Sequence, residues 1–527
     1  MKKIFITIIS LFLCLGFVNA KEPELLWEKT WGDSDNYEVF TASDSYDGIS
    51  HYAVGSTSDS YLAFDLYMKS SKSLNDEKFS KVEKKYYGII VKYDSNGNVL
   101  WEKINHEVSS FFNVRETSDG GAIVWAKNYS YFDHSFLLKY DKDGNVLWKK
   151  EIEQTYYNDS YNTSSISITK DENILLMIGY DSRQIMLFDK NGNQILEKIF
   201  KYTEGEEGSE FYNDSYLDGN DNIVLVGGSS ECKVLSANDR VCESFKKIYK
   251  YDINGNLLFE KKISMEKNVE STFIFVTSRN DEYITLSANV GESQFISLEV
   301  YDNSGNLKDS KKLDINTDDV NSLKVYVDKE NNLVINKYNS YYLESDKYDE
   351  NLNHLWKLEH DDKNVFLNMN IDKNNNYVYV GGIVKEEQLK SELSLQTWAP
   401  PSFYIDQANI IKYGIDYLIS KETEGMGEVN VNLDNARAGD EITIDAKAGE
   451  GYRIDKIIVT DKDGNVIKVS GNKFVMPNSD VTVKVIFTNS PLVNPKTGMI
   501  SITFAVIAIS VFAFFQYKYF KTKEMNL

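Results

Sequence analysis

The chain has 527 residues, a formal net charge of −22 and 13% aromatic residues. Proteins that bind nucleic acids need clustered Lys and Arg to neutralise phosphates, whereas here 80 acidic residues outnumber 58 basic ones. We therefore exclude nucleic acid as a partner. An acidic surface of this kind keeps a displayed protein soluble.

The N-terminal segment has the features of a secretion signal. Lys2 and Lys3 precede an apolar run from Ile4 to Val18, and Val18 to Ala20 read VNA, which supplies small residues for signal peptidase. We expect residues 1–20 to be a removable signal peptide and the rest to be exported.

The C-terminal segment predicts a membrane anchor. Residues 499–517 are expected to form a transmembrane helix, because the run from Met499 to Phe515 is uncharged and almost wholly apolar. Residues 518–527 form a basic tail. By the positive-inside rule this tail stays in the cytoplasm and the body of the protein lies outside.

Residues 488–498 are predicted to be a linker that ends in the motif NPKTG. The order of this motif, an apolar helix and a basic tail resembles the cell-wall sorting signal of sortase substrates in Gram-positive bacteria. The resemblance implies cleavage between Thr497 and Gly498 and attachment to peptidoglycan, with contact to the membrane only through the helix before sorting. Asn494 departs from the commonest form of the motif, which leaves the sortase class open, and an ordinary single-span anchor is the alternative.

A short motif recurs along the middle of the chain, with VKYDSNGNVLWEK and LKYDKDGNVLWKK as its clearest copies. A β-rich segment runs into Asp-x-x-Gly-Asn and leaves as a second β-rich segment, which predicts a hairpin with a Gly at positive φ. Seven copies are spaced by about fifty residues, and their aromatic positions are Tyr93, Tyr140, Phe188, Tyr251, Tyr301, Tyr348 and Tyr413.

A second motif, such as TSDGGAIVWAKN, alternates with the first and predicts another hairpin. Two hairpins give four antiparallel strands per unit, and such small sheets bury both faces only by packing against one another. The sequence therefore predicts an all-β protein with a seven-bladed β-propeller of four-stranded antiparallel blades over residues 24–421. LLWEK at Leu25 to Lys29 copies the fourth strand, so we expect it to close the ring against the last blade and to displace or flank Tyr417 to Lys421.

The acidic turns raise the question of calcium. An EF-hand loop needs a later glycine and a glutamate several residues on, whereas Gly144 comes early and a strand follows at once. We expect Asp141, Asp143 and Asn145 to shape the turn, and we expect no metal ion. The aromatic residues Trp101, Trp148, Phe259 and Trp356 recur at one place in the fourth strands and are predicted to pack between blades.

The repeats resemble those of bacterial surface and secreted propellers built from DGG…VVG…KYDxxGNxxW units. This resemblance implies a fold and no particular activity. Residues 427–487 form a second predicted module, whose segment GYRIDKIIVTDKDGN closely resembles the bacterial repeat related to internalin B-type repeats. The resemblance implies a small all-β stalk between propeller and wall.

Every long insertion falls on one face of the predicted propeller: Thr57 to Tyr87, Ser229 to Lys246 and Lys385 to Gln407. Confinement of long loops to one face is typical of a recognition surface. Exposed aromatic side chains suit protein partners or sugar rings. The candidate ligand surface comprises Tyr131, Phe132, Tyr157, Tyr161, Tyr202, Tyr212, Tyr341 and Trp398, although some of these side chains are expected to pack against the ring.

Cys232 and Cys242 are the only cysteines outside the signal segment. Both lie in one insertion of an exported protein, which predicts a disulfide, with two free thiols as the alternative.

The leading hypothesis is a cell-wall-anchored, non-enzymatic, adhesin-like protein that binds a host protein, a matrix component or a glycan through this face. No catalytic residue and no cofactor are expected. The alternatives are an extracellular glycan hydrolase and a structural envelope protein without a ligand. A sialidase-like site needs clustered arginines, and of the propeller's arginines only Arg115 is predicted to lie on a strand. A carboxylate pair of another glycosidase type stays possible.

Overall fold

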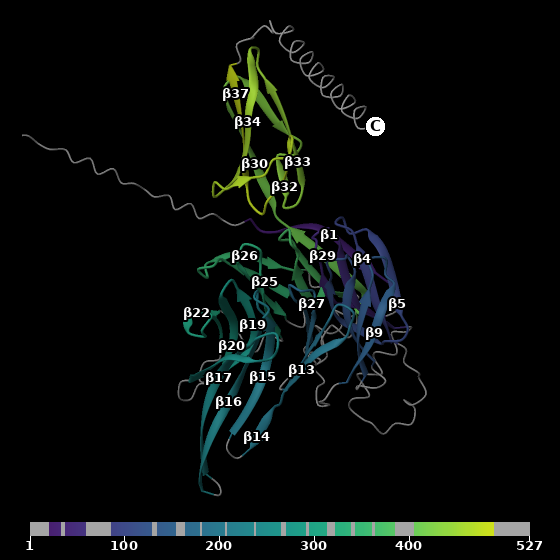
Figure 1. Ribbon diagram of the computed structural model, residues 1–527, viewed down its shortest axis with the longest axis vertical. Helices are drawn as coiled ribbons and strands as arrows, with labels where there is room; N and C mark the ends of the chain where they lie inside the picture. Colours follow the sequence, from purple (N-terminus) through teal and green to yellow (C-terminus); the bar gives the residue numbers. More distant parts are fainter. Residues whose placement is uncertain are drawn as a thin grey trace, which may run out of the picture. The chain divides into compact units, whose positions relative to one another are not determined.

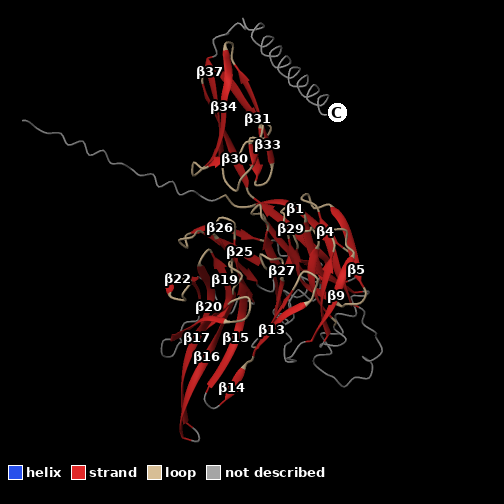
Figure 2. Cartoon of the chain, in the orientation of Figure 1, coloured by secondary structure: helices blue, strands red, loops and turns tan. Residues whose placement is uncertain are grey.

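The computed structural model describes residues 21–32, 37–58, 86–128, 134–153, 164–179, 182–205, 208–236, 239–264, 270–290, 295–313, 322–338, 343–360, 364–384 and 405–489. The chain divides into two compact units, Met1–Asp416 and Tyr417–Leu527 (Figure 1). In these residues every regular element is a β-strand (Figure 2). The predicted signal peptide, the sorting motif with Thr497 and Gly498, and the membrane helix lie outside the described residues. No described helix is long and apolar enough to span a membrane.

The described part of the first unit contains seven antiparallel sheets, numbered here in chain order. Sheet 1 contains β2 (Tyr37–Asp44), β3 (His51–Ser58), β4 (Tyr86–Tyr93) and β5 (Val99–Asn105). Sheet 2 contains β6 (Ser110–Glu116), β7 (Ala122–Lys127), β8 (His134–Tyr140) and β9 (Val146–Glu153). Sheet 3 contains β10 (Ser164–Ile168), β11 (Ile174–Ile178), β12 (Arg183–Phe188) and β13 (Gln194–Phe200). Sheet 4 has five strands, β14 (Thr203–Gly205), β15 (Gly208–Leu217), β16 (Ile223–Ser236), β17 (Asp239–Tyr251) and β18 (Leu257–Ser264).

Sheet 5 contains β19 (Glu270–Arg279), β20 (Glu282–Val290), β21 (Phe295–Tyr301) and β22 (Leu307–Leu313), and sheet 6 contains β23 (Ser322–Val327), β24 (Leu333–Tyr338), β25 (Leu343–Tyr348) and β26 (His354–Glu359). Sheet 7 contains β27 (Asn364–Ile371), β28 (Tyr377–Val384), β29 (Ile405–Gly414) and, from the other end of the unit, β1 (Glu24–Trp31). Among the described residues, six of these sheets have the four antiparallel strands predicted for a repeat, and sheet 4 has a fifth, β14.

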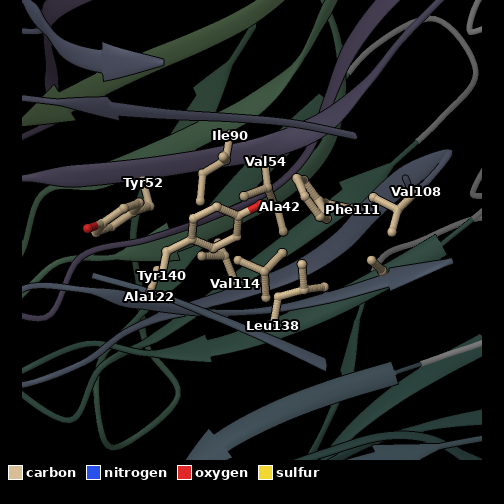
Figure 3. Packing of buried hydrophobic residues seen from close by; sticks show 12 residues of the cluster. Ala42, Tyr52, Val54, Ile90, Val108, Phe111, Val114, Ala122, Leu138 and Tyr140 are labelled. Carbon is tan, nitrogen blue, oxygen red and sulfur yellow. The ribbon is translucent and has the colours of Figure 1, made fainter. Parts of the chain in front are cut away.

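The seven sheets pack face to face in cyclic order. One hydrophobic cluster joins sheets 1 and 2, with Tyr52 and Val54 on one side and Phe111 and Tyr140 on the other (Figure 3). Further clusters join each sheet to the next, and the last of them joins sheet 7 to sheet 1 through Val380 and Ile89. Apolar side chains on both faces of every sheet are thereby buried, and this cyclic packing is the arrangement of a β-propeller.

The N-terminal strand closes the ring, which confirms the prediction made for Leu25 to Lys29. β1 pairs antiparallel with β29, so that Leu25 lies opposite Tyr413 and Lys29 opposite Ile410. This pairing fills the outer edge of sheet 7. The segment Tyr417 to Lys421 is therefore displaced from the ring, and it lies in β30 (Asp416–Glu424) of the second unit.

The fourth strands interlock the sheets, as predicted for their aromatic residues. The Trp101 indole N–H donates a 2.8 Å hydrogen bond to the Lys142 carbonyl in the third-to-fourth turn of the next sheet, and Trp148 makes the equivalent bond to Lys190 at 3.3 Å. A Cβ at Gly144 would lie only 2.9 Å from the Trp101 ring. Gly144 thus has the positive φ that the turn requires and also leaves room for the neighbouring tryptophan.

The aspartate of each acidic turn accepts hydrogen bonds from its own turn, as predicted for Asp141. Its Oδ1 accepts the backbone N–H groups of Asp143 and Asn145, and its Oδ2 accepts the Asn145 side-chain amide at 2.9 Å. Asp94, Asp189, Asp302 and Asp349 make the same bonds to their own turns. The carboxylates are therefore occupied by the turn, and the described residues contain no group of acidic, His and Cys side chains fit to hold a metal ion.

The lysine of the KYD motif has a role that the sequence analysis missed. Lys250 pairs with Asp218 at 3.0 Å, Lys347 with Asp328 at 2.6 Å and Lys412 with Asp372 at 3.0 Å, and all six side chains are buried. Each pair ties a third strand to the first-to-second turn of its own sheet. Removing one partner would leave a buried charge, so these pairs enforce the register of the two hairpins.

The second unit begins earlier than the predicted boundary at residue 427. β30 pairs in parallel with β37 (Val481–Asn489) in a five-stranded sheet that also holds β32 (Asn435–Arg437), β34 (Tyr452–Asp461) and β35 (Val466–Ile467). A three-stranded sheet contains β31 (Gly427–Val431), β33 (Glu441–Ala448) and β36 (Lys473–Val475). Buried Ile442, Val459, Phe474 and Val483 belong to one core. Since β30 is a strand of this unit, the propeller ends at residue 416 and not at 421.

Candidate ligand-binding cavity

The structure describes two of the eight residues predicted to form the ligand surface. Tyr202 follows β13 and is 41% exposed. Its phenol donates a hydrogen bond to Glu204 at 3.0 Å. The other predicted surface residues, Tyr131, Phe132, Tyr157, Tyr161, Tyr341 and Trp398, lie outside the described residues, as do most of the long insertions 57–87 and 385–407.

Tyr212 is not a surface residue, so its prediction was wrong. Only 8% of it is exposed, and its ring lies 5.5 Å from that of Phe200 and 5.7 Å from that of Tyr249. Burial raises the pKa of the Tyr212 phenol above its usual value. The residue is part of β15 and fills the core between sheets 3 and 4.

The insertion from Ser229 to Lys246 is a continuation of the sheet and not an irregular loop. β16 and β17 pair from Ile223 opposite Tyr251 to Ser236 opposite Asp239, and Figure 1 shows this hairpin extending past the neighbouring strands. Cys232 is disulfide-bonded, and the residue opposite it in the ladder is Cys242. We refer to Glu231 to Glu243 as the hairpin arm.

The expectation that only Arg115 lies on a strand was also wrong. Arg183 begins β12, Arg240 lies in β17 and Arg279 ends β19. Arg183 is buried and donates to the Asn213 carbonyl, while Arg279 pairs with Glu282 at 2.8 Å. The sequence did not predict strands at these three arginines, because the strands extend beyond the segments that the repeated motifs mark.

A cavity of about 830 Å³ lies at the centre of the ring. One strand of every sheet contributes to its wall, namely β2, β6, β10, β15, β19, β23 and β27, and we call these the first strands. Cavities of this size accommodate small organic ligands. Seven segments that are far apart in the sequence meet here, so periodicity alone does not identify the site.

β-Bulges direct side chains into this cavity. The pairing register shifts between Phe40 and Ala42, between Phe111 and Asn113, and between Tyr212 and Asp214. In each case the aromatic residue is buried and the extra residue, Thr41, Phe112 or Asn213, lines the cavity. In β2 and β15 the signal is an aromatic residue followed directly by a polar one, Phe40-Thr41 and Tyr212-Asn213, which sequence reasoning missed.

The lining carries both signs of charge. Asp44 accepts the Glu116 backbone N–H at 2.8 Å and lies 3.5 Å from Arg115, and Asp214 accepts the Val276 backbone N–H at 2.9 Å. Burial raises the pKa of both carboxyl groups, against the opposing effect of Arg115 on Asp44 and of Arg183 on Asp214. Both carboxylates link one sheet to the next.

Lys324 on β23 is a weakly paired charge of the lining. Its Nζ lies 3.4 Å from the Leu367 carbonyl and 3.5 Å from Asn368 Oδ1, which are long contacts. Among the described residues no carboxylate lies within ion-pair distance of it. Burial lowers the pKa of Lys324 to about 8, although the charge of Asp214 acts in the opposite direction.

Comparison with known proteins identifies the second unit. Residues 417–491 match the family model of the divergent InlB B-repeat domain, which agrees with the start of β30. No curated protein matches the chain.

Among solved structures, the chain is similar to the Dos1 propeller, with 11% identity, a TM-score of 0.39, and coverage of 73% of this chain and 95% of that one. It is also similar to the β-propeller domain of the Trilobed protease from Pyrococcus furiosus, with 13% identity, a TM-score of 0.38, and coverage of 66% and 91%. A streptogramin B lyase gives 10% identity, a TM-score of 0.38, and coverage of 73% and 97%. The cyclic packing of its antiparallel sheets makes the first unit a β-propeller, and the second unit matches the divergent InlB B-repeat family model.

Proposed function

We propose that this protein is an extracellular, surface-anchored binding protein whose seven-bladed propeller presents an insertion face to a host protein, matrix component or glycan. The observation that supports this function most is the order of the two units, because a B-repeat-type domain directly follows the propeller. Such a domain serves as a spacer that raises the propeller above the wall.

The proposal favours binding over turnover. Asp44 and Asp214, the carboxylates of the central cavity, accept backbone N–H groups of the following sheets at 2.8 and 2.9 Å. Carboxylates that hold sheets together are poorly suited to moving protons during hydrolysis, since protonation would weaken those contacts. Fold similarity alone licenses no activity.

Binding of an array of glycans and matrix proteins by the secreted segment Lys21 to Ser490 tests this function. We expect a bound partner whose signal is lost when Tyr131, Tyr157 and Tyr341 are replaced by Ala. The matched control is Lys142→Ala, which removes an exposed side chain on the opposite, short-turn face. Robust polysaccharide turnover, or binding by residues 417–489 alone, would contradict the proposal.

The anchoring part has a separate test in a Gram-positive host. We expect the full chain in the cell-wall fraction, joined to peptidoglycan through Thr497. A Thr497→Ala variant should shift it to the membrane fraction. Equal wall attachment of both proteins would show that NPKTG is not a sorting motif.

A further inference from the structure

The central cavity is lined by strands of all seven sheets, and its chemistry points to a ligand of its own. Three cationic side chains line it, Arg115, Lys324 and Lys329, against two carboxylates, Asp44 and Asp214. A local excess of positive charge is unusual in a chain whose net charge is −22. Salt screens the outer acidic surface over about 8–10 Å, so a small anion inside the cavity responds mainly to these near charges.

Two of the cations are incompletely paired. Lys324 has only long contacts with neutral oxygens, at 3.4 and 3.5 Å. The Arg115 guanidinium contacts Asp44 at 3.5 Å and its own neighbour's carbonyl, that of Val114, at 3.0 Å, and 37% of its side chain is exposed. A guanidinium has five N–H donors, so Arg115 retains donors for a ligand carboxylate.

The rest of the lining is suited to hydroxyl groups and to a ring. Ser165 and Ser167 on β10 are partly exposed, and amide side chains come from β6, β15 and β27. The rings of Phe112, Tyr216 and Phe275 also line the cavity and are partly exposed. Aromatic faces pack against the C–H face of a sugar, while hydroxyl and amide groups exchange hydrogen bonds with its hydroxyls.

We infer that the central cavity binds a sugar that carries a carboxylate, with Lys324 and Arg115 supplying the positive charge and the polar side chains of the first strands contacting the ring hydroxyls. This ligand contacts the residues that line the cavity, whereas the partner in the proposed function contacts the insertion residues. The propeller is thus a two-site binding protein. The volume of about 830 Å³ admits a mono- or disaccharide acid and excludes a folded protein.

The direct test is calorimetric titration of the segment Lys21 to Ser490 with D-glucuronate, D-galacturonate and N-acetylneuraminate. D-Glucose is the neutral control and inorganic phosphate the control for unspecific anion binding. We expect at least one sugar acid to bind roughly tenfold tighter, or more, than glucose and phosphate, because a charge-assisted pair is worth about that factor. Absence of sugar-acid binding at millimolar concentration, or equal binding of glucose or phosphate, would overturn the inference.

Variants test whether Lys324 and Arg115 supply the positive charge that binds the sugar carboxylate. Lys324→Met and Arg115→Gln should each weaken sugar-acid binding roughly tenfold to a hundredfold. Lys142→Met changes an exposed lysine of a turn outside the cavity, and it should have no effect. Equal affinity of all three variants and the unmodified protein would place the ligand elsewhere.

A pH series on the unmodified protein is independent of any folding defect in a variant. The pKa of Lys324 lies at about 8, so sugar-acid affinity should fall from about pH 7 to about pH 9.5 as this side chain loses its charge. A flat profile would contradict a role for Lys324. Loss of array binding in the tyrosine variant with sugar-acid binding intact would separate this site from the insertion face.

Discussion

The indole N–H of Trp27 donates a 2.9 Å hydrogen bond to the main-chain carbonyl of Ser95, 68 residues later in the chain. Trp27 belongs to β1 at the outer edge of sheet 7, and Ser95 lies in the third-to-fourth turn of sheet 1. The N-terminal strand therefore repeats, across the closing seam, the contact that Trp101 and Trp148 make between consecutive sheets. One interaction thus recurs inside the ring and at its closure.

We predict that Trp27→Ala destabilises the propeller by roughly 3 kcal/mol, near the lower end for tryptophan because the side chain is only partly buried. The substitution removes the hydrogen bond to Ser95 and the packing of the indole beneath Gly97. This packing is close, because a Cβ added at Gly97 would lie 2.8 Å from the indole ring. Urea denaturation of the segment Lys21 to Ser490 measures the loss.

Leu25→Ala is the matched control for Trp27→Ala. Leu25 lies in the same strand but is 54% exposed, so its truncation should cost well under 1 kcal/mol. Equal destabilisation by the two substitutions would show that the strand matters only through its backbone pairing with β29. Hydrogen exchange of Leu25 to Lys29 as slow as that of β29 would confirm closure in solution.

Alanine substitutions at two turn glycines distinguish the cost of backbone strain from the cost of packing between sheets. Gly144 has a φ of 83° and faces the Trp101 ring, whereas Gly120 has a φ of 75° and would place a Cβ only against Lys142 at 3.6 Å. Ala at either position should lower the free energy of unfolding by about 1–2 kcal/mol, because it must adopt the left-handed conformation. Gly144→Ala should cost a further 1–3 kcal/mol, roughly, for overpacking against the indole. Equal losses in the two variants would mean that the indole moves aside freely.

The parts of the fold that were predictable are those encoded within one repeat. Turn chemistry at Asp141 and Asn145, the recurring Trp101 position and the β1 copy at Leu25 to Lys29 each depend on residues close in sequence. Alternation with a period of two and the Asp-x-x-Gly-Asn turn identify the hairpins. Since the hairpins repeat, the cyclic packing of the sheets follows from the same local pattern.

The candidate site was not predictable in the same way. A bulge after Tyr212 changes which side chains of β15 face the core, and no periodicity reveals where a bulge falls. Tyr212 was misplaced on the surface because the prediction assigns it to a loop, whereas β15 already begins at Gly208. Lys324 and Asp214 lie more than a hundred positions apart, and only closure of the ring brings them to one cavity. Neither belongs to the repeated motif, so nothing in their spacing indicated a site.

Acid should destabilise the propeller through two buried histidines. Burial lowers the pKa of His51 to about 3, with Lys412 adding to the effect, and burial lowers that of His360 to about 3. An unfolded histidine titrates near pH 6.5, so between about pH 6.5 and about pH 3 the unfolded chain binds more protons. The free energy of unfolding should fall with decreasing pH in this window, by about 1.4 kcal/mol per pH unit for each histidine.

His360→Phe isolates one of these two contributions. The imidazole is packed 4.3 Å from the ring of Tyr379 and 4.8 Å from that of Phe366, and neither of its nitrogens has a hydrogen-bond partner among the described residues. A phenyl ring suits this apolar site and binds no proton. The free energy of unfolding of the variant should therefore fall less steeply with decreasing pH, by about the slope that one proton contributes. His106→Phe, which changes an exposed residue, is the matched control. Equal slopes in all three proteins would contradict a neutral, buried His360.

The disulfide of the hairpin arm should stabilise the arm and not the ring. Beyond Glu231 and Phe245 no strand in the described part of the chain pairs with the arm, and an isolated two-stranded ribbon is marginal in water. Cys232→Ser should therefore speed hydrogen exchange in Glu231 to Glu243, with a local loss of about 2–3 kcal/mol, while the propeller transition in urea stays unchanged. A thiol reagent should label neither cysteine of the secreted protein before reduction and both after it. Quantitative labelling without reduction would rule the bridge out, and a shifted propeller transition in Cys232→Ser would show that the arm is part of the core instead.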